Sequence, residues 1–294
     1  MDPIRVVVRR GGVTEARHVV HAAAVRDGRL AASAGDPRLT TLLRSSAKPF
    51  QALPLARAYD DLDARELAIA SASHLHDRAQ LDAVRMLLSR AHATEADLEC
   101  GTEGEPPSKL KHNCSGKHAG MLAVCLAHGW RTEGYRLPGH RMQRRNLEDV
   151  ARAAGLHRDE IRTATDGCGV VTFALPLERM AAMFAGLESS REGKRVAEAM
   201  RSHPELIRGR GATDTVLMQS LPGAVAKGGA EGLLCGLLPD GTGLAVKCAD
   251  GNQRALPAAL AIFLGVLGFE MPKFASTEVR NSRGDLVGEI VAEA

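Results

Sequence analysis

Strand-like segments stand at both ends of this sequence, and the chain between them has a helical pattern. Short runs rich in valine and alanine near the start are punctuated by turn signals such as Asp27-Gly28. Similar runs return late in the chain and are joined through the turn sequence PDGTG. The expected strands are residues 4–12, 15–26, 29–35, 223–238 and 243–250. A sheet built from these segments requires the two ends of the chain to pack together.

The middle of the chain, at about residues 75–220, is expected to be helical. Residues 77–93 have an acidic start and an apolar stripe with the spacing of one helix face, at Leu81, Val84, Leu87 and Leu88. Further helices are expected at residues 117–130, 139–155, 175–186, 190–202 and 212–220. We therefore expect an α+β fold, with a mostly antiparallel sheet and a helical lobe packed on it, in a single domain of residues 1–294.

The composition argues against several classes of protein. The net charge is only +3, and acidic residues are interspersed among the basic ones, so no nucleic-acid partner is expected. No stretch approaches the roughly 18 uninterrupted apolar residues of a membrane span, and no signal peptide is visible. The six cysteines favour thiols or metal ligands over disulfides. We expect a cytoplasmic protein that acts on a small molecule and not on a membrane.

The segment RSSAKPFQ contains the first group of residues that could carry out a reaction. Ser45 and Lys48 are three positions apart, so they share one face at the start of a helix. A lysine whose pKa is depressed by burial can remove the serine proton, and the N–H groups of the helix start can stabilise an oxyanion. The alternative is an N-cap serine followed by a surface lysine, because S-x-x-K is a common sequence.

Two further segments supply partners for this pair. SASHLHD places Ser71 and Ser73 among small residues, and VAKGGAEG places Lys227 in a strand before two glycines that permit close backbone approach. Penicillin-recognising serine enzymes use the same roles, namely a Ser-x-x-Lys helix, a second serine and a strand lysine. Their S-D-N motif is absent here, and K-G-G replaces their K-T-G. The match is therefore to the roles of the residues and not to the literal motifs.

Cysteine and lysine form a second group, in the segments KHNCSGKHAGM and TDGCGV. Cys114 and Lys117 are again three positions apart, and Cys168 lies between glycines that allow a sharp turn. Two thiolates and one nitrogen ligand suit zinc. The nitrogen could come from His112 or His118, or from Lys117, which would have to be neutral to bind a metal. The alternative is a pair of ordinary buried thiols, with the lysine paired to a carboxylate.

In the order of its segments, the chain resembles the asparaginase II family, the rhizobial-type L-asparaginases. The resemblance runs from about residue 5 to about residue 270 and rests on RSSAKPFQALPL, ASHLHD, HNCSGKHAGML, TDGCGVVTFALPL, AKGGAEGLLC and VKCADGNQRA. It implies a fold like that of serine β-lactamases and glutaminases, a homodimer, and a zinc cofactor. It also implies hydrolysis of the side-chain amide of L-asparagine to L-aspartate and ammonia.

The resemblance assigns roles to individual residues by matching motif. The catalytic pairs would be Ser45 with Lys48 and Ser73 with Lys227. The zinc ligands would be Cys114, Lys117 and Cys168. The substrate contacts would be Asp166, Arg44 and His118. In the expected mechanism Ser45 attacks the amide carbon, and Lys48 accepts its proton.

The chain departs from the family pattern at Leu75-His76 and at Val170-Val171, and the first pair bears on how a substrate fits. Two other functions stay open on the sequence alone. One is another serine amidohydrolase on the same scaffold, such as a glutaminase or a β-lactam-acting enzyme, and the other is a non-catalytic zinc protein. One methylene separates asparagine from glutamine and is worth only about 1–3 kcal/mol in a pocket, so the sequence does not choose between them.

Overall fold

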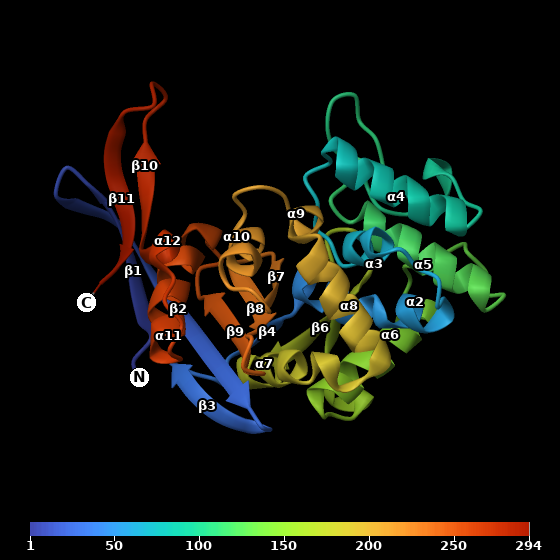
Figure 1. The fold of residues 1–294 in the computed structure, drawn as a ribbon, viewed down its shortest axis with the longest axis horizontal. Helices are drawn as coiled ribbons and strands as arrows, with labels where there is room; N and C mark the ends of the chain where they lie inside the picture. Colours follow the sequence, from blue (N-terminus) through green and yellow to red (C-terminus); the bar gives the residue numbers. More distant parts are fainter. Residues whose placement is uncertain (294) are drawn as a thin grey trace.

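The computed structural model describes residues 1–293 and contains a large antiparallel sheet built from both ends of the chain (Figure 1). Its strands run in the order β10-β11-β1-β2-β9-β8-β7, with β3 paired to β2. They are β1 (Ile4–Arg10), β2 (Val13–Arg26), β3 (Arg29–Ala34), β7 (Val225–Gly229), β8 (Leu233–Leu237), β9 (Gly243–Cys248), β10 (Ser276–Arg280) and β11 (Leu286–Ala292). The expected meeting of the two chain ends is confirmed, because β11 pairs with β1 and places Ile290 opposite Val8.

Strand β2 connects the two halves of this sheet. Its first part pairs with β1, and its last part pairs with both β3 and β9, so that Ala22 lies between Ala34 and Val246. The helices α7 (Leu177–Ala185) and α11 (Leu256–Val266) both pack against β2 and β9. A Cβ on Gly243 would lie 2.0 Å from the carbonyl oxygen of Ala181, so α7 touches the backbone of β9 directly.

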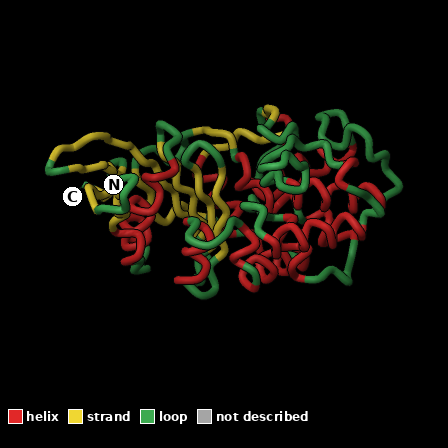
Figure 2. Tube along the Cα trace, turned by 90° about the horizontal axis from the view of Figure 1, so that it is seen from above, coloured by secondary structure: helices red, strands yellow, loops and turns green. Residues whose placement is uncertain are grey.

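Helices form the other half of the molecule (Figure 2). Those of the lobe are α1 (Lys48–Gln51), α2 (Leu53–Ala58), α3 (Ala64–Ala70), α4 (Arg78–Arg90), α5 (Ser115–Ala127), α6 (Arg141–Ala154), α8 (Arg191–Ser202), α9 (Pro204–Ile207) and α10 (Thr213–Ser220), and α12 (Pro272–Ala275) follows α11. Helix α5 is buried almost throughout and packs against α2, α3 and α4. Within residues 1–293, no helix combines the length and the apolar character that a membrane crossing needs.

Local sequence signals account for several helix boundaries. The helix expected at residues 77–93 is α4, and Asp77 and Gln80 form a capping box at its start. Helix α6 ends at Gly155, whose φ of +63° is the left-handed conformation that favours glycine. Pro49 lies in the first turn of α1, where its missing N–H is not needed.

A small second sheet was not expected from the sequence. Its strands, in the order β4-β6-β5, are β4 (Thr40–Leu42), β5 (Thr163–Thr165) and β6 (Val171–Pro176). We expected a helix at residues 175–186 and no strand before it. Pro176 has an extended backbone and caps α7, so the helix begins only at Leu177. This sheet holds the chain just before α1.

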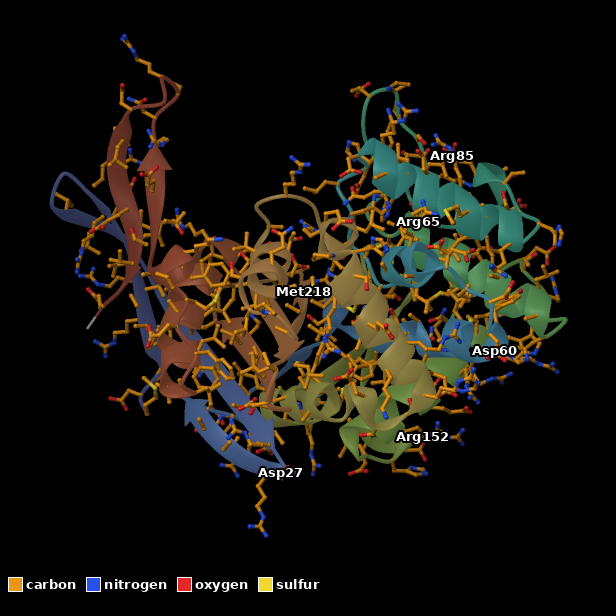
Figure 3. All side chains as sticks on the ribbon, in the orientation of Figure 1. Asp27, Asp60, Arg65, Arg85, Arg152 and Met218 are labelled. Atoms are coloured by element: carbon orange, nitrogen blue, oxygen red, sulfur yellow. The ribbon has the colours of Figure 1, made fainter. Side chains whose placement is uncertain are left out.

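Charged side chains cover the outside of the helical lobe and are neutralised locally (Figure 3). Of the residues labelled there, Arg65, Arg85 and Arg152 each form an ion pair with an aspartate close in sequence. Asp60 pairs with Arg191 of α8 at 3.1 Å. The pairs of Arg65, Arg85 and Asp60 are exposed and contribute little to stability, whereas the Asp149 partner of Arg152 is buried.

The contact between α7 and Gly243 provides a test of the packing. We expect Gly243→Ala to lower the free energy of unfolding by about 1–3 kcal/mol, because the added methyl group would overlap backbone atoms of α7. Gly265→Ala in α11 is the matched control, since a Cβ there meets no atom within 4 Å and alanine is the better helix former. Urea unfolding followed by circular dichroism measures both variants. Equal stability of the two would contradict the close contact.

Candidate active site

A cavity of about 570 Å³ is lined by both the edge strand β7 and the helical lobe. Six of the residues expected to be functional lie in its wall, namely Arg44, Ser45, Ser73, Cys114, Asp166 and Cys168. The three expected lysines, Lys48, Lys117 and Lys227, are buried and contact residues beside or within this wall. The structure therefore gathers into one place segments that lie far apart in the sequence.

Ser45 lies in a short 3₁₀ turn (Arg44–Ala47) between β4 and α1. The small sheet fixes this turn, because the N–H groups of Leu43 and Arg44 donate to the Phe173 carbonyl at 2.7 Å and the Thr172 hydroxyl at 3.0 Å. Arg44 has a φ of +48°, which is strained for a residue other than glycine. The turn presents a partly exposed Ser45 to the cavity.

Strand β7 comes close to this turn because glycines follow Lys227. A Cβ on Gly229 would lie 3.0 Å from the Ser46 hydroxyl and 3.1 Å from the Leu43 carbonyl oxygen. The Ser46 hydroxyl in turn donates to the carbonyl of Lys227 at 2.8 Å. The close backbone approach expected from the K-G-G segment is confirmed.

Lys48 is fully buried, and its amine contacts Ser73. The distance from Lys48 Nζ to Ser73 Oγ is 2.8 Å, and the amine also donates to the carbonyls of Ala72 and Asn113. A neutral amine suits these partners, because it donates two protons to carbonyls and accepts one from a hydroxyl. Burial lowers the pKa of Lys48, and the charge of Lys117 lowers it further.

The pairing of serines and lysines differs from the expected one. We expected Ser45 with Lys48 and Ser73 with Lys227, but the amine of Lys48 bonds to Ser73. Within residues 1–293 the Ser45 hydroxyl has no hydrogen bond. The reason is the direction of the Lys48 side chain, which runs inward to carbonyl groups just beyond α3 while Ser45 stays at the cavity surface.

Lys227 is also fully buried, and its charged neighbour is Asp214 in the first turn of α10. Its Nζ donates to the Gly228 carbonyl at 2.7 Å and lies 3.8 Å from Asp214 Oδ2. Burial lowers the pKa of Lys227 to about 7, and Lys48 and Arg208 contribute, although the Asp214 carboxylate opposes the change. Lys227 therefore exists in both protonation states near neutral pH.

The three expected zinc ligands lie together at the cavity wall. Lys117 Nζ is 3.1 Å from Cys168 Sγ, and the Cys114 thiol donates to Asn113 Oδ1 at 3.1 Å. The two thiols lie close enough to shift each other's pKa. Cys114 precedes the first turn of α5, and Cys168 lies in a tight turn in which the Gly169 N–H donates to the Asp166 carbonyl. Gly169 has a φ of +83°, so this turn requires its glycine.

The charges of these three residues compensate one another. The neighbouring thiol of Cys168 holds the pKa of Cys114 well below its usual range, and the charges of Lys48 and Lys117 act in the same direction. The Cys114 side chain, together with burial, raises the pKa of Cys168. Burial opposes the charge on Lys117, yet its two sulfur neighbours raise the pKa of this lysine. Two sulfurs, which zinc accepts as ligands, thus lie beside one amine, and this amine would have to give up its proton to bind a metal.

Asp166 and Arg44, two of the expected substrate contacts, form an ion pair at the cavity. Arg44 Nε donates to Asp166 Oδ1 at 2.7 Å. Glu231 lies 4.0 Å from the same guanidinium but is well exposed. Both partners line the cavity, so a substrate can reach them, although each already neutralises the other.

The third expected substrate contact, His118, does not line the cavity. It is fully buried in α5, and its Nδ1 lies 2.7 Å from the hydroxyl of Tyr135. That hydroxyl also accepts the N–H of Glu99, so Tyr135 links α5 to the segment before it. Burial holds the pKa of His118 well below its usual value. Its position in the helix core corrects the expectation of a substrate contact.

A second group of possible metal ligands lies away from the cavity, at His18, Cys248 and Asp250. His18 Nδ1 is 2.6 Å from Asp250 Oδ2, and the Cys248 thiol donates to Asp250 Oδ1 at 2.9 Å. Arg254 Nε donates to His18 Nε2 at 3.1 Å, which places the proton of the neutral ring on Nδ1. No nitrogen lone pair is then free for a metal, and the group ties strands β2 and β9 to the loop before α11.

Sequence reasoning missed three charged residues that line the cavity. One is Glu103, and the other two are Asp214 and Arg208. Asp214 gave no signal, because an acid in the first turn of a helix is ordinary. Arg208 lies in the segment RGRGA, which reads only as a basic loop. Both acquire their positions through contacts between segments distant in the sequence.

Solved structures superpose on this chain at low sequence identity. Mglu in its glutamate form superposes with a TM-score of 0.50 at 16% identity, over 86% of this chain and 62% of that chain. Mglu in its L-glutamate binding form gives 0.46 at 19% identity, over 86% and 61% of the two chains. A β-lactamase from Mycobacterium bovis gives 0.42 at 15% identity, over 85% and 94%. The chain therefore spans less than two thirds of the Mglu chains.

The superposition on Mglu in its glutamate form agrees with the α+β fold expected from the sequence. No curated protein sequence matches the chain significantly. The family model for L-asparaginase II, however, matches residues 6–292 and supports the expected class of enzyme, an amidohydrolase. Because that match includes every segment on which the sequence resemblance rested, this chain belongs to the L-asparaginase II family.

Proposed function

We propose that this protein is an L-asparaginase, which hydrolyses the side-chain amide of L-asparagine through an acyl-enzyme formed on a serine. The observation that carries the proposal is the 2.8 Å hydrogen bond between the buried Lys48 amine and the Ser73 hydroxyl, in a cavity that Ser45 also lines. A serine is a weak nucleophile until a base removes its proton, and a buried amine can be that base. Family membership supports an amide as the substrate.

In the first step of the proposed reaction, Ser45 Oγ attacks the side-chain carbonyl carbon of asparagine. Ser45 is the better candidate for the nucleophile because it is partly exposed, whereas Ser73 is 2% exposed and held by Lys48. The proton of Ser45 passes to Ser73 Oγ, and the Ser73 proton passes to Lys48 Nζ. A tetrahedral intermediate and a protonated Lys48 result.

In the second step, the C–N bond breaks and the departing nitrogen needs a proton to leave as ammonia. Lys227 is the proposed donor, because its pKa of about 7 keeps a large fraction of it protonated near neutral pH. Water then attacks the ester and gives one proton to Lys227 as L-aspartate forms. Lys48 returns its proton through Ser73 to Ser45, so both lysines regain their starting states.

We also propose that Cys114, Lys117 and Cys168 hold a zinc ion. Their two sulfurs and one amine already lie close together. A zinc ion held by these three residues would have room for a further ligand, and both cysteines line the cavity. When bound, zinc would supply a positive charge that orients an oxygen of the substrate.

The two serines are tested by single substitutions assayed for ammonia release from L-asparagine, with L-glutamine in parallel. We expect Ser45→Ala to lower kcat by at least about 10⁴-fold, because it removes the nucleophile. Ser73→Ala should lower kcat by about 10²–10⁴-fold, because it removes only a proton carrier. Ser71→Ala, a buried serine bonded to the Leu67 carbonyl, is the control. Complete loss in Ser73→Ala with turnover remaining in Ser45→Ala would make Ser73 the nucleophile.

The role of Lys227 is tested through Asp214→Asn and the pH dependence of kcat/KM. The groups that influence Lys227 are Asp214, Lys48, Arg208 and Cys114. The Asp214 carboxylate favours the protonated amine, so its removal lowers the pKa of Lys227 below about 7. The proposed donor must be protonated, and it loses its proton as the pH rises. The fall of kcat/KM with rising pH should therefore begin at a lower pH in Asp214→Asn than in the wild type.

The matched control for this substitution is Asp27→Asn, in the turn between β2 and β3 at the far end of the sheet (Figure 3). Asp27 has a φ of +50°, a conformation that asparagine also tolerates. Asp27→Asn should leave the pH profile unchanged. If the fall of kcat/KM with rising pH begins at a higher pH in Asp214→Asn, or at the same pH as in the wild type, Lys227 is excluded as the proton donor.

The zinc proposal is tested by metal analysis of Cys168→Ser. We expect this variant to lose bound zinc while its circular dichroism spectrum stays like that of the wild type, because serine keeps the size of the side chain but is a poor zinc ligand. Cys248→Ser is the control, since its hydroxyl can keep the hydrogen bond to Asp250. If Cys168→Ser retains one zinc ion per chain, the metal is held by other residues.

A further inference from the structure

Arg208 places a guanidinium in the cavity beside the catalytic serines. It lies in the loop between α9 and α10, and its Nη1 donates to the carbonyl of Ser73 at 3.2 Å. This is the one hydrogen bond that its side chain makes within residues 1–293. The Nε and Nη2 groups, which form one edge of the guanidinium, therefore have no acceptor in that part of the chain.

The backbone at Arg208 is held firmly by Gln80, which is fully buried. Gln80 Nε2 donates to the carbonyls of Glu205 at 3.0 Å and Arg208 at 3.1 Å. Gln80 Oε1 accepts the N–H of Leu75 at 2.9 Å. One amide side chain thus fixes the Arg208 loop to the segment that follows Ser73, so the guanidinium is positioned relative to the serine.

The two arginines that line the cavity differ in their electrostatic partners. Arg44 is neutralised by Asp166 at 2.7 Å, whereas Arg208 has no carboxylate within 4.0 Å in the described part of the chain. A partly buried cation without a counter-ion is unfavourable. Its charge also reaches Lys227, whose pKa it lowers. The cavity therefore offers an unused site for an anion.

We propose that Arg208 binds the α-carboxylate of the substrate and so makes the enzyme select α-amino acid amides over amides that lack this group. The inference rests on the proposed L-asparaginase function. Two parallel N–H donors on one edge of a guanidinium match the two oxygens of a carboxylate. The hydrogen bond to the Ser73 carbonyl places this charge next to the proposed proton carrier, in the cavity that Ser45 also lines.

The test compares L-asparagine with its α-carboxamide, L-aspartic acid diamide, in which the α-carboxylate is neutral. For Arg208→Gln we expect kcat/KM for L-asparagine to fall by about 10- to 100-fold, because a charge-assisted hydrogen-bond pair is lost. The value for the diamide should stay within about threefold of the wild type. Arg208→Lys keeps the charge but not the paired donors. Its kcat/KM for L-asparagine should lie between the values of the wild type and Arg208→Gln.

Arg210→Gln is the matched control, because Arg210 is an exposed arginine of the same loop and does not line the cavity. In Arg210→Gln, kcat/KM for both substrates should stay within about threefold of the wild-type values. Equal losses for L-asparagine and the diamide in Arg208→Gln would overturn the proposal, since they would show that Arg208 only supports the structure around Ser73. An unchanged value for L-asparagine would overturn it as well.

A binding measurement separates this inference from the proposed function. Calorimetric titration with L-aspartate requires no turnover, and we expect its Kd to rise by about 10-fold or more in Arg208→Gln but not in Arg210→Gln. If the wild type hydrolyses neither amide yet shows this difference, carboxylate binding by Arg208 stands and the L-asparaginase function fails. If the wild type hydrolyses L-asparagine and Kd is the same in both variants, the carboxylate site fails alone.

Discussion

The chemistry of this cavity depends on the burial of two lysine amines, those of Lys48 and Lys227. Removing an ammonium from water costs several kcal/mol, so a buried lysine needs either a counter-ion or a loss of its proton. The fold uses both solutions. Lys48 has carbonyl and hydroxyl partners that suit a neutral amine, whereas Lys227 lies near the Asp214 carboxylate. The two lysines therefore differ in the protonation state that their surroundings favour.

Backbone contact at glycines makes this burial possible. Helix α5 touches α3 where a Cβ on Gly116 would lie 2.2 Å from the Ile69 carbonyl oxygen, and β7 touches the Ser45 turn at Gly229. Each contact brings a whole element closer than side chains would allow, and each lies within a few residues of a lysine of the site. Close packing excludes water from the amines, and the exclusion of water lowers the pKa of Lys48 and Lys227.

The sequence predicted well those features that depend on neighbouring residues or on chain ends. Periodicity located α4, the glycine after α6 marked its end, and the strand patterns predicted a sheet that joins both termini. The pairing of Lys48 with Ser73 could not be predicted, because spacing shows that Ser45 and Lys48 share a turn but not which way the lysine points. The direction depends on carbonyl groups after α3, which only the folded chain supplies.

The same distinction explains the cavity residues that sequence reasoning missed. Arg208 and Ser73 are separated by more than a hundred positions, and their contact exists because buried Gln80 binds both neighbouring loops. No local pattern encodes such a contact, since arginine in a glycine-rich loop is ordinary.

The groups that face the cavity and those that lie behind it have different physical requirements. In the proposed mechanism, side chains such as Ser45 and Arg208 must reach a substrate, and turns and loops fixed by backbone hydrogen bonds carry them. In the proposed mechanism the amines of Lys48 and Lys227 must stay shielded from bulk solvent, because full hydration would restore their ordinary pKa and remove the proposed base and acid. The interface between sheet and lobe meets both requirements at once. The packing that stabilises this interface is therefore also what sets the protonation states of the site.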